Sequence, residues 1–422
     1  MGKDLNILTS VSKLFTEEVL RNSLVEAYEC QDAKVIDWSF EGTSAKGDSY
    51  LSTVRKICIK GIIKGNEKDL KIVVKSLPEN LGRRKTYRSS DFFYNEIMFY
   101  TKIMPLFLEF LTAKNLNHLL YIPKCLGYML DGENDFIILE DAGVHGFQCP
   151  SRQNSLSLDD CKVILKAMAH FHGVSFAYKF QNKEKFDDAA GQLKETYFSE
   201  DHWNWYKKFY NLIMIATKDA MAKEYGGTPE EKRFSAISNR DLWERSVKIC
   251  SRSQTPTSVI NQGDAWAPNF LIRTDETTGE KEALLLDFQL ARWTGPVTDV
   301  SFFIYSCTDR TLRDQSFSYL LNYYHDELSS TISVLGSDPV KIYSLETFMK
   351  EVKEEFVHGL NFSFESIIMA TLGDDEVYDL DTIKGNDAID ISEAWPVKPL
   401  KSQEKRRRLA DVIIHAMKCG FL

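Results

Sequence analysis

The chain has 422 residues, 43% of them hydrophobic, and carries 52 basic against 61 acidic residues, which gives a net charge of −9. This length allows two domains, or two lobes of one unit, with an ample apolar core. The negative charge argues against nucleic acid or an anionic membrane surface as the main partner, and no uncharged apolar run reaches the roughly 20 residues of a membrane-spanning helix.

The eight cysteines are scattered along the chain without a C-x-x-C pair. Such usage is typical of a reducing compartment, where cysteine serves as a small buried hydrophobe. The polar start MGKDLNILTS is also unlike a signal peptide. We therefore expect a cytoplasmic protein without a membrane span.

A helix and then a small sheet are predicted at the start of the chain. Residues 11–30 repeat apolar positions with helical spacing, and three apolar runs of strand length follow at 35–40, 50–59 and 70–75. Short turns between these runs favour an antiparallel sheet. The first turn, residues 41–49, contains two glycines that would let backbone N–H groups approach a triphosphate. A plain turn explains these glycines equally well.

The third strand ends in Ile72-Val73-Val74-Lys75, which places a lysine after a buried apolar run. A lysine in this position reaches the α- and β-phosphates of ATP in phosphoryl transferases of the protein-kinase type. A buried ammonium group requires a counter-charge. The next helix offers Glu96 on its apolar face, and the order along the chain favours an ion pair with Lys75 over an ordinary surface glutamate.

The apolar run 135–140 predicts a further strand, followed by Asp141-Ala142-Gly143. In kinase-like folds this strand ends at the hinge between two lobes, where backbone groups contact the adenine ring. Glu140 and Ala142 are the candidates for these contacts. We therefore expect residues 1–140 to form an ATP-binding lobe, and residues 141–422 to form a helical lobe with the catalytic loop, the metal loop and the acceptor site.

Helices dominate the predicted second lobe. Ser157 precedes a long apolar helix whose His170 and His172 are interpreted as packing or network histidines, because two positions apart they point to different sides. Residues 180–200 are polar and predict a loop over the substrate site. An aromatic cluster at 203–210 is either core or the wall of an apolar pocket. The other predicted elements are helices at 312–335, 345–360 and 402–418, the last ended by Gly420, and an acidic loop at 373–390.

The segment 259–305 carries the most informative pattern. Phe270-Leu271-Ile272 and Ala283-Leu284-Leu285-Leu286 predict two strands joined by a hairpin with Gly279 in its turn. This hairpin would bring Asp264 and Asn269 close to Asp287. Carboxylate and amide oxygens of this kind suit Mg²⁺, which leaves positions for substrate phosphates.

The spacing D-x-x-x-x-N, followed by a strand and Asp-Phe, is the catalytic-loop and metal-loop pattern of protein-kinase-type phosphoryl transferases. In that pattern Asp264 accepts the proton of an attacking hydroxyl, while Asn269 and Asp287 hold the metal. Each residue alone is weak evidence, because Asp and Asn are common in turns. Asp299 is expected to bond to the backbone of the loop that carries Asp264, or else to cap its own helix.

With these residues the chain resembles the insect ecdysteroid-kinase-like family, a branch of the choline-kinase and aminoglycoside-phosphotransferase superfamily. The matching motifs are Gln262-Gly263-Asp264-Ala265-Trp266-Ala267-Pro268-Asn269, Leu286-Asp287-Phe288-Gln289-Leu290-Ala291 and Pro296-Val297-Thr298-Asp299, supported by Lys75, Glu96, Leu139-Glu140-Asp141 and Ala169-His170-Phe171-His172. The resemblance extends to about Leu360. It implies an α+β, two-lobed protein-kinase-like fold with a small antiparallel-sheet lobe and a larger, mainly helical lobe, and ATP-dependent phosphorylation of a hydroxyl on a small molecule, in known cases an ecdysteroid.

One position departs from the family pattern. Gln262 stands where the family usually has a histidine that shapes the loop without transferring protons. Glutamine can replace the hydrogen bonds of that histidine but not its ring packing, so activity is expected, with reduced activity as the alternative.

Two alternatives follow. One is a non-catalytic pseudokinase that binds nucleotide or a hydrophobic ligand. The other is a choline- or ethanolamine-type kinase, whose cationic acceptor would require carboxylates and aromatic faces in the pocket.

Overall fold

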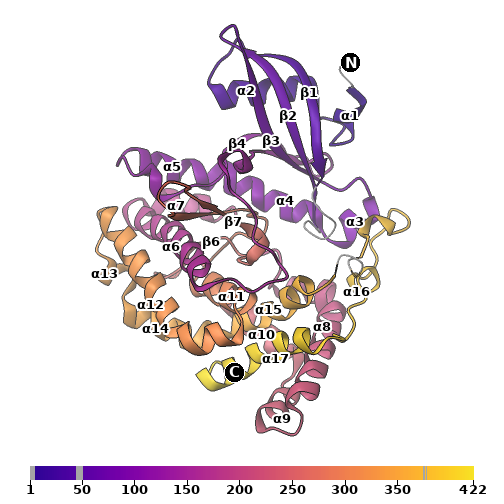
Figure 1. Cartoon of the computed structure of the whole chain (residues 1–422), viewed down its shortest axis with the longest axis vertical. Helices are drawn as coiled ribbons and strands as arrows, with labels where there is room; N and C mark the ends of the chain where they lie inside the picture. Colours follow the sequence, from indigo (N-terminus) through magenta and orange to yellow (C-terminus); the bar gives the residue numbers. More distant parts are fainter. Residues whose placement is uncertain (1–4, 44–50, 374–375, 377) are drawn as a thin grey trace.

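Five antiparallel strands occupy one end of the molecule, and helices make up most of the remainder (Figure 1). The computed structural model describes residues 5–43, 51–373, 376 and 378–422. The strand order is β1-β2-β3-β5-β4, with bounds Lys34–Thr43, Thr53–Ile63, Asn66–Ser76, Phe136–Glu140 and Cys125–Met129 for β1, β2, β3, β5 and β4. The predicted α+β class, with a small antiparallel sheet and a mainly helical remainder, is confirmed.

Alternation of apolar side chains explains the sheet. Ile57 and Ile59 of β2 and Ile72 and Val74 of β3 are buried in one cluster, since residues two apart share a face. Helix α2 (Glu17–Tyr28) contributes Leu20 and Leu24 to the same cluster and so covers this face. The edge strand β4 was not predicted, because its five residues are mostly exposed or half-buried and show no clear alternation.

Below the sheet lies helix α4 (Ser89–Met98), preceded by α1 (Leu5–Thr9) and α3 (Leu81–Thr86) in the chain (Figure 1). A π-helical turn, Phe99–Ile103, joins α4 to α5 (Met104–Thr112). Pro105 stands in the first turn of α5, where its missing N–H costs least. Because Phe92, Phe93 and Ile97 are fully buried, α4 is fixed firmly beneath the sheet.

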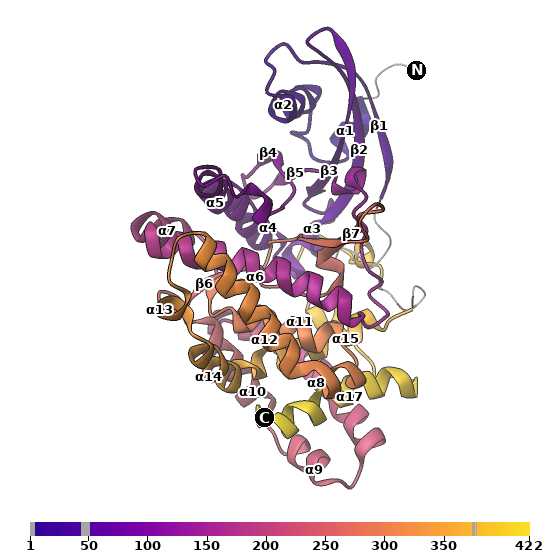
Figure 2. The same cartoon turned by 60° about the vertical axis from the view of Figure 1, so that its left-hand side comes forward.

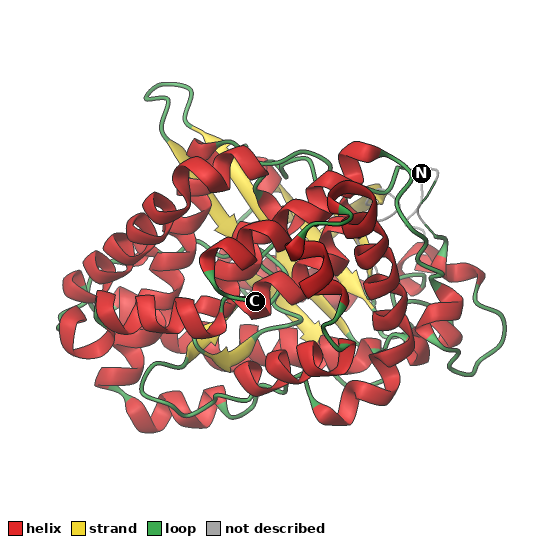
Figure 3. Cartoon of the chain, turned by 90° about the horizontal axis from the view of Figure 1, so that it is seen from below, coloured by secondary structure: helices red, strands yellow, loops and turns green. Residues whose placement is uncertain are grey.

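Long helices pack side by side in the remainder, as α6 and α12 do in both side views (Figure 2). Helices also surround the short strands in the view from below (Figure 3). The bounds are α6 Leu158–Gln181, α7 Lys183–Ala190, α8 Trp203–Tyr225, α9 Pro229–Ser235, α10 Asn239–Cys250, α11 Val297–Cys307, α12 Arg310–Val334, α13 Pro339–Tyr343, α14 Leu345–Glu355, α15 Val357–Ala370, α16 Ile391–Ala394 and α17 Gln403–Cys419. No helix within the described residues is long and apolar enough to cross a bilayer.

Two pairs of short strands carry the loops of the central segment. Strand β6 (Val259–Asn261) pairs with β9 (Arg292–Thr294), and β7 (Phe270–Thr274) pairs with β8 (Lys281–Leu285). The β7–β8 hairpin is the predicted one, and Gly279 has a φ angle of 74° in its turn.

Three sequence expectations need correction or fall outside the structure. Residues 180–200 do not form one loop, because α6 continues to Gln181 and α7 follows, with Phe186 buried against Trp293. The predicted helix 345–360 is two helices, α14 and α15, separated at Phe356. Of the glycine-containing turn 41–49, residues 44–49 lie outside the described residues.

A strap formed by residues 379–395 joins the sheet end of the molecule to the helical region. Asn80, the cap of α3, donates through Nδ2 to the carbonyls of Asp381 (3.0 Å) and Ile383 (2.9 Å). The N–H of Ile389 donates to Oγ1 of Thr86 at 3.0 Å. The strap, predicted in part as an acidic loop, is therefore held against α3 and ends with α16 beside α8 (Figure 1).

Candidate functional site

The loop after β6 is held by a buried carboxylate from α11. Asp299, 1% exposed, accepts the backbone N–H of Gln262 at 2.7 Å and that of Gly263 at 2.9 Å. His172 lies on the other side of Asp299, with Nε2 at 3.2 Å, and its Nδ1 is 2.8 Å from the hydroxyl of Tyr324. This places Asp299 where it fixes the start of the loop, and it places His172 in the packed network that was predicted.

Gly263 shows why this loop needs glycine. Its φ angle is 87°, and a Cβ atom there would lie 1.8 Å from the carbonyl oxygen of Leu290. A larger residue would therefore force apart the loop after β6 and the loop after β8.

Gln262 joins the same two loops through its side chain. Its Nε2 donates to the carbonyls of Leu286 and Asp287, both at 2.8 Å, and its Oε1 accepts the N–H of Asp264 at 2.8 Å. The residue is fully buried. One amide thus satisfies two acceptors and one donor, which a single imidazole ring cannot do at once.

Asp264 and Asn269 lie together at the end of this loop. Nδ2 of Asn269 donates to the Asp264 carbonyl at 2.9 Å and to its Oδ2 at 2.8 Å. Oδ1 of Asn269 has no hydrogen-bond partner among the described residues, so the side-chain oxygen remains available. Burial, and next the charge of Asp287, raise the pKa of Asp264 to about 7.

Asp287 faces the lysine of β3. Its Oδ2 is 3.1 Å from Nζ of Lys75, and its φ angle of 59° is unusual for a residue other than glycine. Lys75 in turn lies 2.8 Å from the carboxylate of Glu96, whose side chain is fully buried. Burial raises the pKa of Glu96 to about 7 despite the lysine charge, while the two carboxylates together outweigh burial and raise the pKa of Lys75.

The structure therefore brings together the residues predicted from three separate segments. Lys75 comes from the sheet, Glu96 from α4, and Asp264, Asn269 and Asp287 from the two loops. No cluster of three or more His, Cys, Asp or Glu suited to a metal occurs in the described part of the chain. A cation here would have two carboxylates and an amide oxygen.

Glu140 and Ala142 lie at the end of β5. The N–H of Glu140 donates to the carbonyl of Lys124 at 3.0 Å, and its carboxylate is 3.1 Å from Nε2 of His145. Ala142 is buried and opens a short 3-10 turn, Ala142–His145. Because the Glu140 N–H is already bonded, only its carbonyl is left for the predicted adenine contact.

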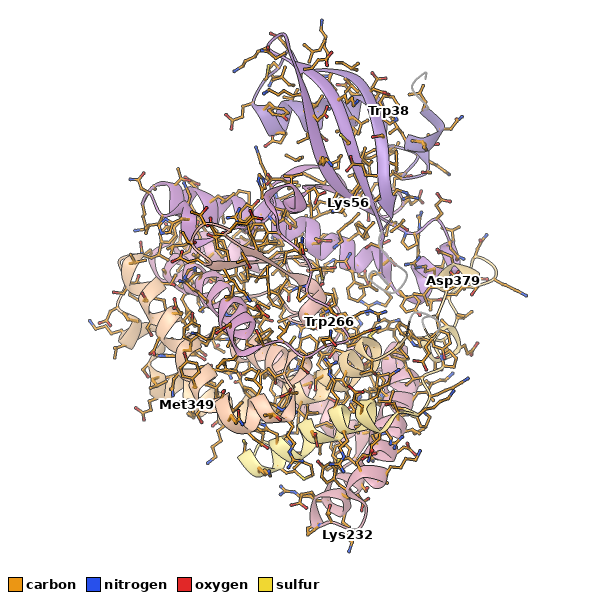
Figure 4. All side chains as sticks on the ribbon, in the orientation of Figure 1. Trp38, Lys56, Lys232, Trp266, Met349 and Asp379 are labelled. Atoms are coloured by element: carbon orange, nitrogen blue, oxygen red, sulfur yellow. The ribbon has the colours of Figure 1, made fainter. Side chains whose placement is uncertain are left out.

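A cavity of about 120 Å³ opens beside Asp264, Asn269 and Asp287. Its other walls are mostly aromatic and come from α8, α11, α15, the strap and the loops; they include Tyr87, Tyr197, Trp205, Phe209, Trp266, Phe302, Phe362 and Trp395. Trp266 lies in the middle of the molecule, below the end of the sheet marked by Lys56 (Figure 4). Of the aromatic cluster predicted at 203–210, Trp205 and Phe209 line this cavity.

Glu365 is the charged residue of this cavity that the sequence analysis missed. It lies on α15 in the run Asn-Phe-Ser-Phe-Glu-Ser-Ile-Ile-Met, residues 361–369, where it is the one acidic residue of a largely buried helix. That lone acidic residue is the signal that would have found it, because a charge in a buried helix needs a partner.

Comparison with known proteins gives a family match. A model described as the ecdysteroid kinase-like family matches residues 46–337. Similar solved structures include a Plasmodium vivax ethanolamine kinase, at 13% identity and a TM-score of 0.39, covering 80% of this chain and 78% of that one. A GDP complex of aminoglycoside 2′-phosphotransferase-IIIa has 13% identity, a TM-score of 0.35 and coverage of 82% and 97%. The choline kinase LicA from Streptococcus pneumoniae has 11% identity, a TM-score of 0.32 and coverage of 84% and 98%. Curated proteins gave no match.

Proposed function

Because this chain belongs to the ecdysteroid kinase-like family, we propose that it is a small-molecule kinase, which transfers the terminal phosphoryl group of ATP to a hydroxyl of its acceptor. The observation that carries this proposal is the meeting of Asp264, Asn269 and Asp287 at one cavity, with the Lys75–Glu96 pair in contact with Asp287. Such a set suits phosphoryl transfer, which depends mainly on positioning and charge neutralisation.

The chain's own residues have distinct roles in this proposal. Lys75, oriented by Glu96, binds the phosphates of ATP, and the backbone of Glu140 and Ala142 binds its adenine. Asp264 orients the acceptor hydroxyl and accepts its proton. Asp299 and Gln262 keep Asp264 in place through the backbone bonds described above.

The donor set fits Mg²⁺. Asp287 supplies a carboxylate and Asn269 an amide oxygen without another partner, and Mg²⁺ is bound by one or two such ligands together with substrate phosphates. When bound, the ion neutralises charge on the phosphates. Asn269 and Asp287 are the residues that would hold it.

An ecdysteroid or related sterol is the acceptor that the family description suggests. A cavity of about 150 Å³ holds benzene, so the present 120 Å³ receives only the reacting end of a sterol unless the strap moves. A choline- or ethanolamine-type acceptor is the second candidate, favoured by the aromatic walls and by Glu365.

Phosphate transfer from labelled ATP tests the proposal directly. The purified chain with Mg²⁺ is assayed against hydroxylated steroids, cholines and glycosides, and ATP binding is followed in parallel by thermal shift. Asp264→Asn should lower turnover by about 100- to 10,000-fold while the thermal shift with ATP is retained.

The alternative of a pseudokinase makes a different prediction. It would show a thermal shift with ATP but no transfer to any acceptor and no ADP formation. Turnover that survives in Asp264→Asn would refute the role given to Asp264.

A further inference from the structure

Glu365 places a carboxylate in the wall of the aromatic cavity, where most of the neighbouring side chains are apolar rings. The cavity residues Phe302 and Phe362 stack with ring centroids 4.2 Å apart, and Tyr197 and Trp205 meet at 5.6 Å. Among the described residues that line the cavity, none is Lys, Arg or His. The Glu365 charge therefore has no cationic partner among the described residues of the cavity wall.

Two tyrosine hydroxyls hold one oxygen of this carboxylate. Tyr197 donates to Oε2 at 2.6 Å, and Tyr206 donates to the same atom. Oε1 has no hydrogen-bond partner among the described residues. Burial raises the pKa of Glu365 even though both tyrosines favour the charged form.

The loop that carries Tyr197 is itself fixed. Glu195 accepts the N–H groups of Tyr197 at 2.9 Å and Phe198 at 2.7 Å, and the buried Arg292 lies 3.2 Å from the other oxygen of Glu195. The orientation of Glu365 is thus set before any ligand arrives.

A purely structural glutamate looks different in this molecule. Glu351, 4% exposed, also accepts a tyrosine hydroxyl, from Tyr343 on Oε2. Its second oxygen accepts from Arg252 at 3.0 Å and Thr257 at 2.6 Å. Both oxygens of Glu351 are satisfied within the protein, whereas Glu365 keeps one oxygen for something else.

A second unpaired group lies at the same cavity. Gln289 is 2% exposed and lines the cavity, and its Nε2 has no partner among the described residues. Buried donors and acceptors normally find partners, because an unsatisfied one costs about 1–3 kcal/mol. A ligand that accepts from the unpaired Gln289 amide and donates to Oε1 of the half-buried Glu365 would satisfy both groups of this apolar cavity.

We propose that Glu365, held by Tyr197 and Tyr206, is the second anchor of the acceptor, and that it binds a hydrogen-bond donor, a hydroxyl or a protonated amine, on the reacting end of that molecule. This inference rests on the proposed function, since Asp264 defines where the other hydroxyl lies. The acceptor class is therefore an apolar molecule with two polar groups near one end, and a simple alcohol of the same size binds poorly.

Three probes with one benzene-sized body test this class. They are para-benzenedimethanol, para-(aminomethyl)benzyl alcohol and para-ethylbenzyl alcohol, which differ only in whether the second group is hydroxyl, ammonium or methyl. Binding to the wild-type chain is measured by calorimetry without ATP, so the result is independent of turnover. At least one two-donor probe should bind about tenfold more tightly than the ethyl compound.

Glu365→Gln then identifies the group responsible. The variant should abolish a preference for the ammonium probe and reduce a preference for the diol, because the amide keeps one acceptor but no charge. The matched control Glu351→Gln should leave every preference unchanged while lowering thermal stability. The relative affinities of the amine and the diol distinguish the two kinds of donor.

Other outcomes overturn the inference. Equal binding of all three probes to the wild-type chain would show that no second anchor exists, and this comparison needs no variant. A preference that persists in Glu365→Gln would assign it to another residue. Absence of phosphate transfer alongside a Glu365-dependent preference would instead contradict only the proposed function.

Discussion

The two sides of the site treat a carboxylate in opposite ways, with Glu96 fully buried and Glu365 half-buried. On the nucleotide side, Glu96 is fully buried but lies 2.8 Å from Lys75, which also contacts Asp287. On the acceptor side, Glu365 has only two neutral hydroxyls, both on the same oxygen. The first arrangement is complete within the protein, and the second is completed by a ligand. In the proposed function, this difference separates residues that take part in phosphoryl transfer from residues that select the acceptor.

Replacing Lys75, on the proposed nucleotide side, should have the largest effect on stability and on phosphate transfer. Lys75→Met leaves Glu96 buried without a cation, which should cost about 3–5 kcal/mol of unfolding free energy and nearly all phosphate transfer. Denaturant titration and kinetics measure both. Lys71→Met is the control on the same strand, because its pair with Glu41 is partly exposed and such pairs contribute little to stability. Equal effects of the two variants would show that the buried Lys75–Glu96 pair matters no more than a partly exposed pair on the same strand.

Replacing Gln262 should break the link between the two loops. Gln262→Glu keeps the bond from the Asp264 N–H but loses both donors and sets a charge against the carbonyls of Leu286 and Asp287. We expect a loss of about 2–3 kcal/mol and a fall in kcat with little change in the KM for the acceptor. Gln262→His should be milder, since one ring nitrogen can still donate. A change confined to the acceptor KM would show that Gln262 acts in acceptor binding and not in phosphate transfer.

Replacing Asn95 is expected to weaken the binding of both ATP and the acceptor, because Asn95 contacts both sides of the site. Its Nδ2 donates to the carbonyl of Ala291 at 2.7 Å, in the loop after Asp287, and its Oδ1 accepts the N–H of Lys194 at 2.9 Å, before Tyr197. Asn95→Ala leaves these buried groups unpaired, at about 1–3 kcal/mol. The KM values for ATP and for the acceptor should rise together. A rise in only one of them would show that the two sides are held independently.

The smallest expected effect concerns Tyr206. Tyr206→Phe removes one of two donors to Glu365, a change of about 1 kcal/mol, or about fivefold in affinity. It should appear in the acceptor KM and leave the KM for ATP unchanged. Tyr210→Phe is the neighbouring control, because the Tyr210 hydroxyl bonds to Asn361 instead, at 2.5 Å. An equal change in both variants would indicate a general loss of packing in α8.

The sequence was informative for the nucleotide side because its residues stand at strand ends and in tight loops. Lys75 follows a run of β-branched residues, and Asp287 follows the strand of a hairpin, so local patterns place both. Helix α7 was missed because its eight residues are mostly polar, and only Phe186 and two alanines are buried. The break at Phe356 was missed because apolar spacing continues across it.

The acceptor side could not be assembled from sequence. Tyr197, Phe362 and Trp395 come from three distant segments, and helical periodicity indicates which face is buried but not which helices meet. Gly359 shows how closely two of them meet: a Cβ atom there would lie 2.1 Å from the backbone of Ser301. That contact sets the spacing of α11 and α15, and no local pattern reveals it.

The strap and α15 have a consequence for how related enzymes can diverge. The family match ends at residue 337 and includes Lys75 through Asp299, whereas Phe362, Glu365, Ile391 and Trp395 follow it and line the cavity. Selection could therefore remodel one wall of the pocket while the residues proposed for phosphoryl transfer stay unchanged. Exchange of this C-terminal portion between paralogues would be a direct route to new acceptors.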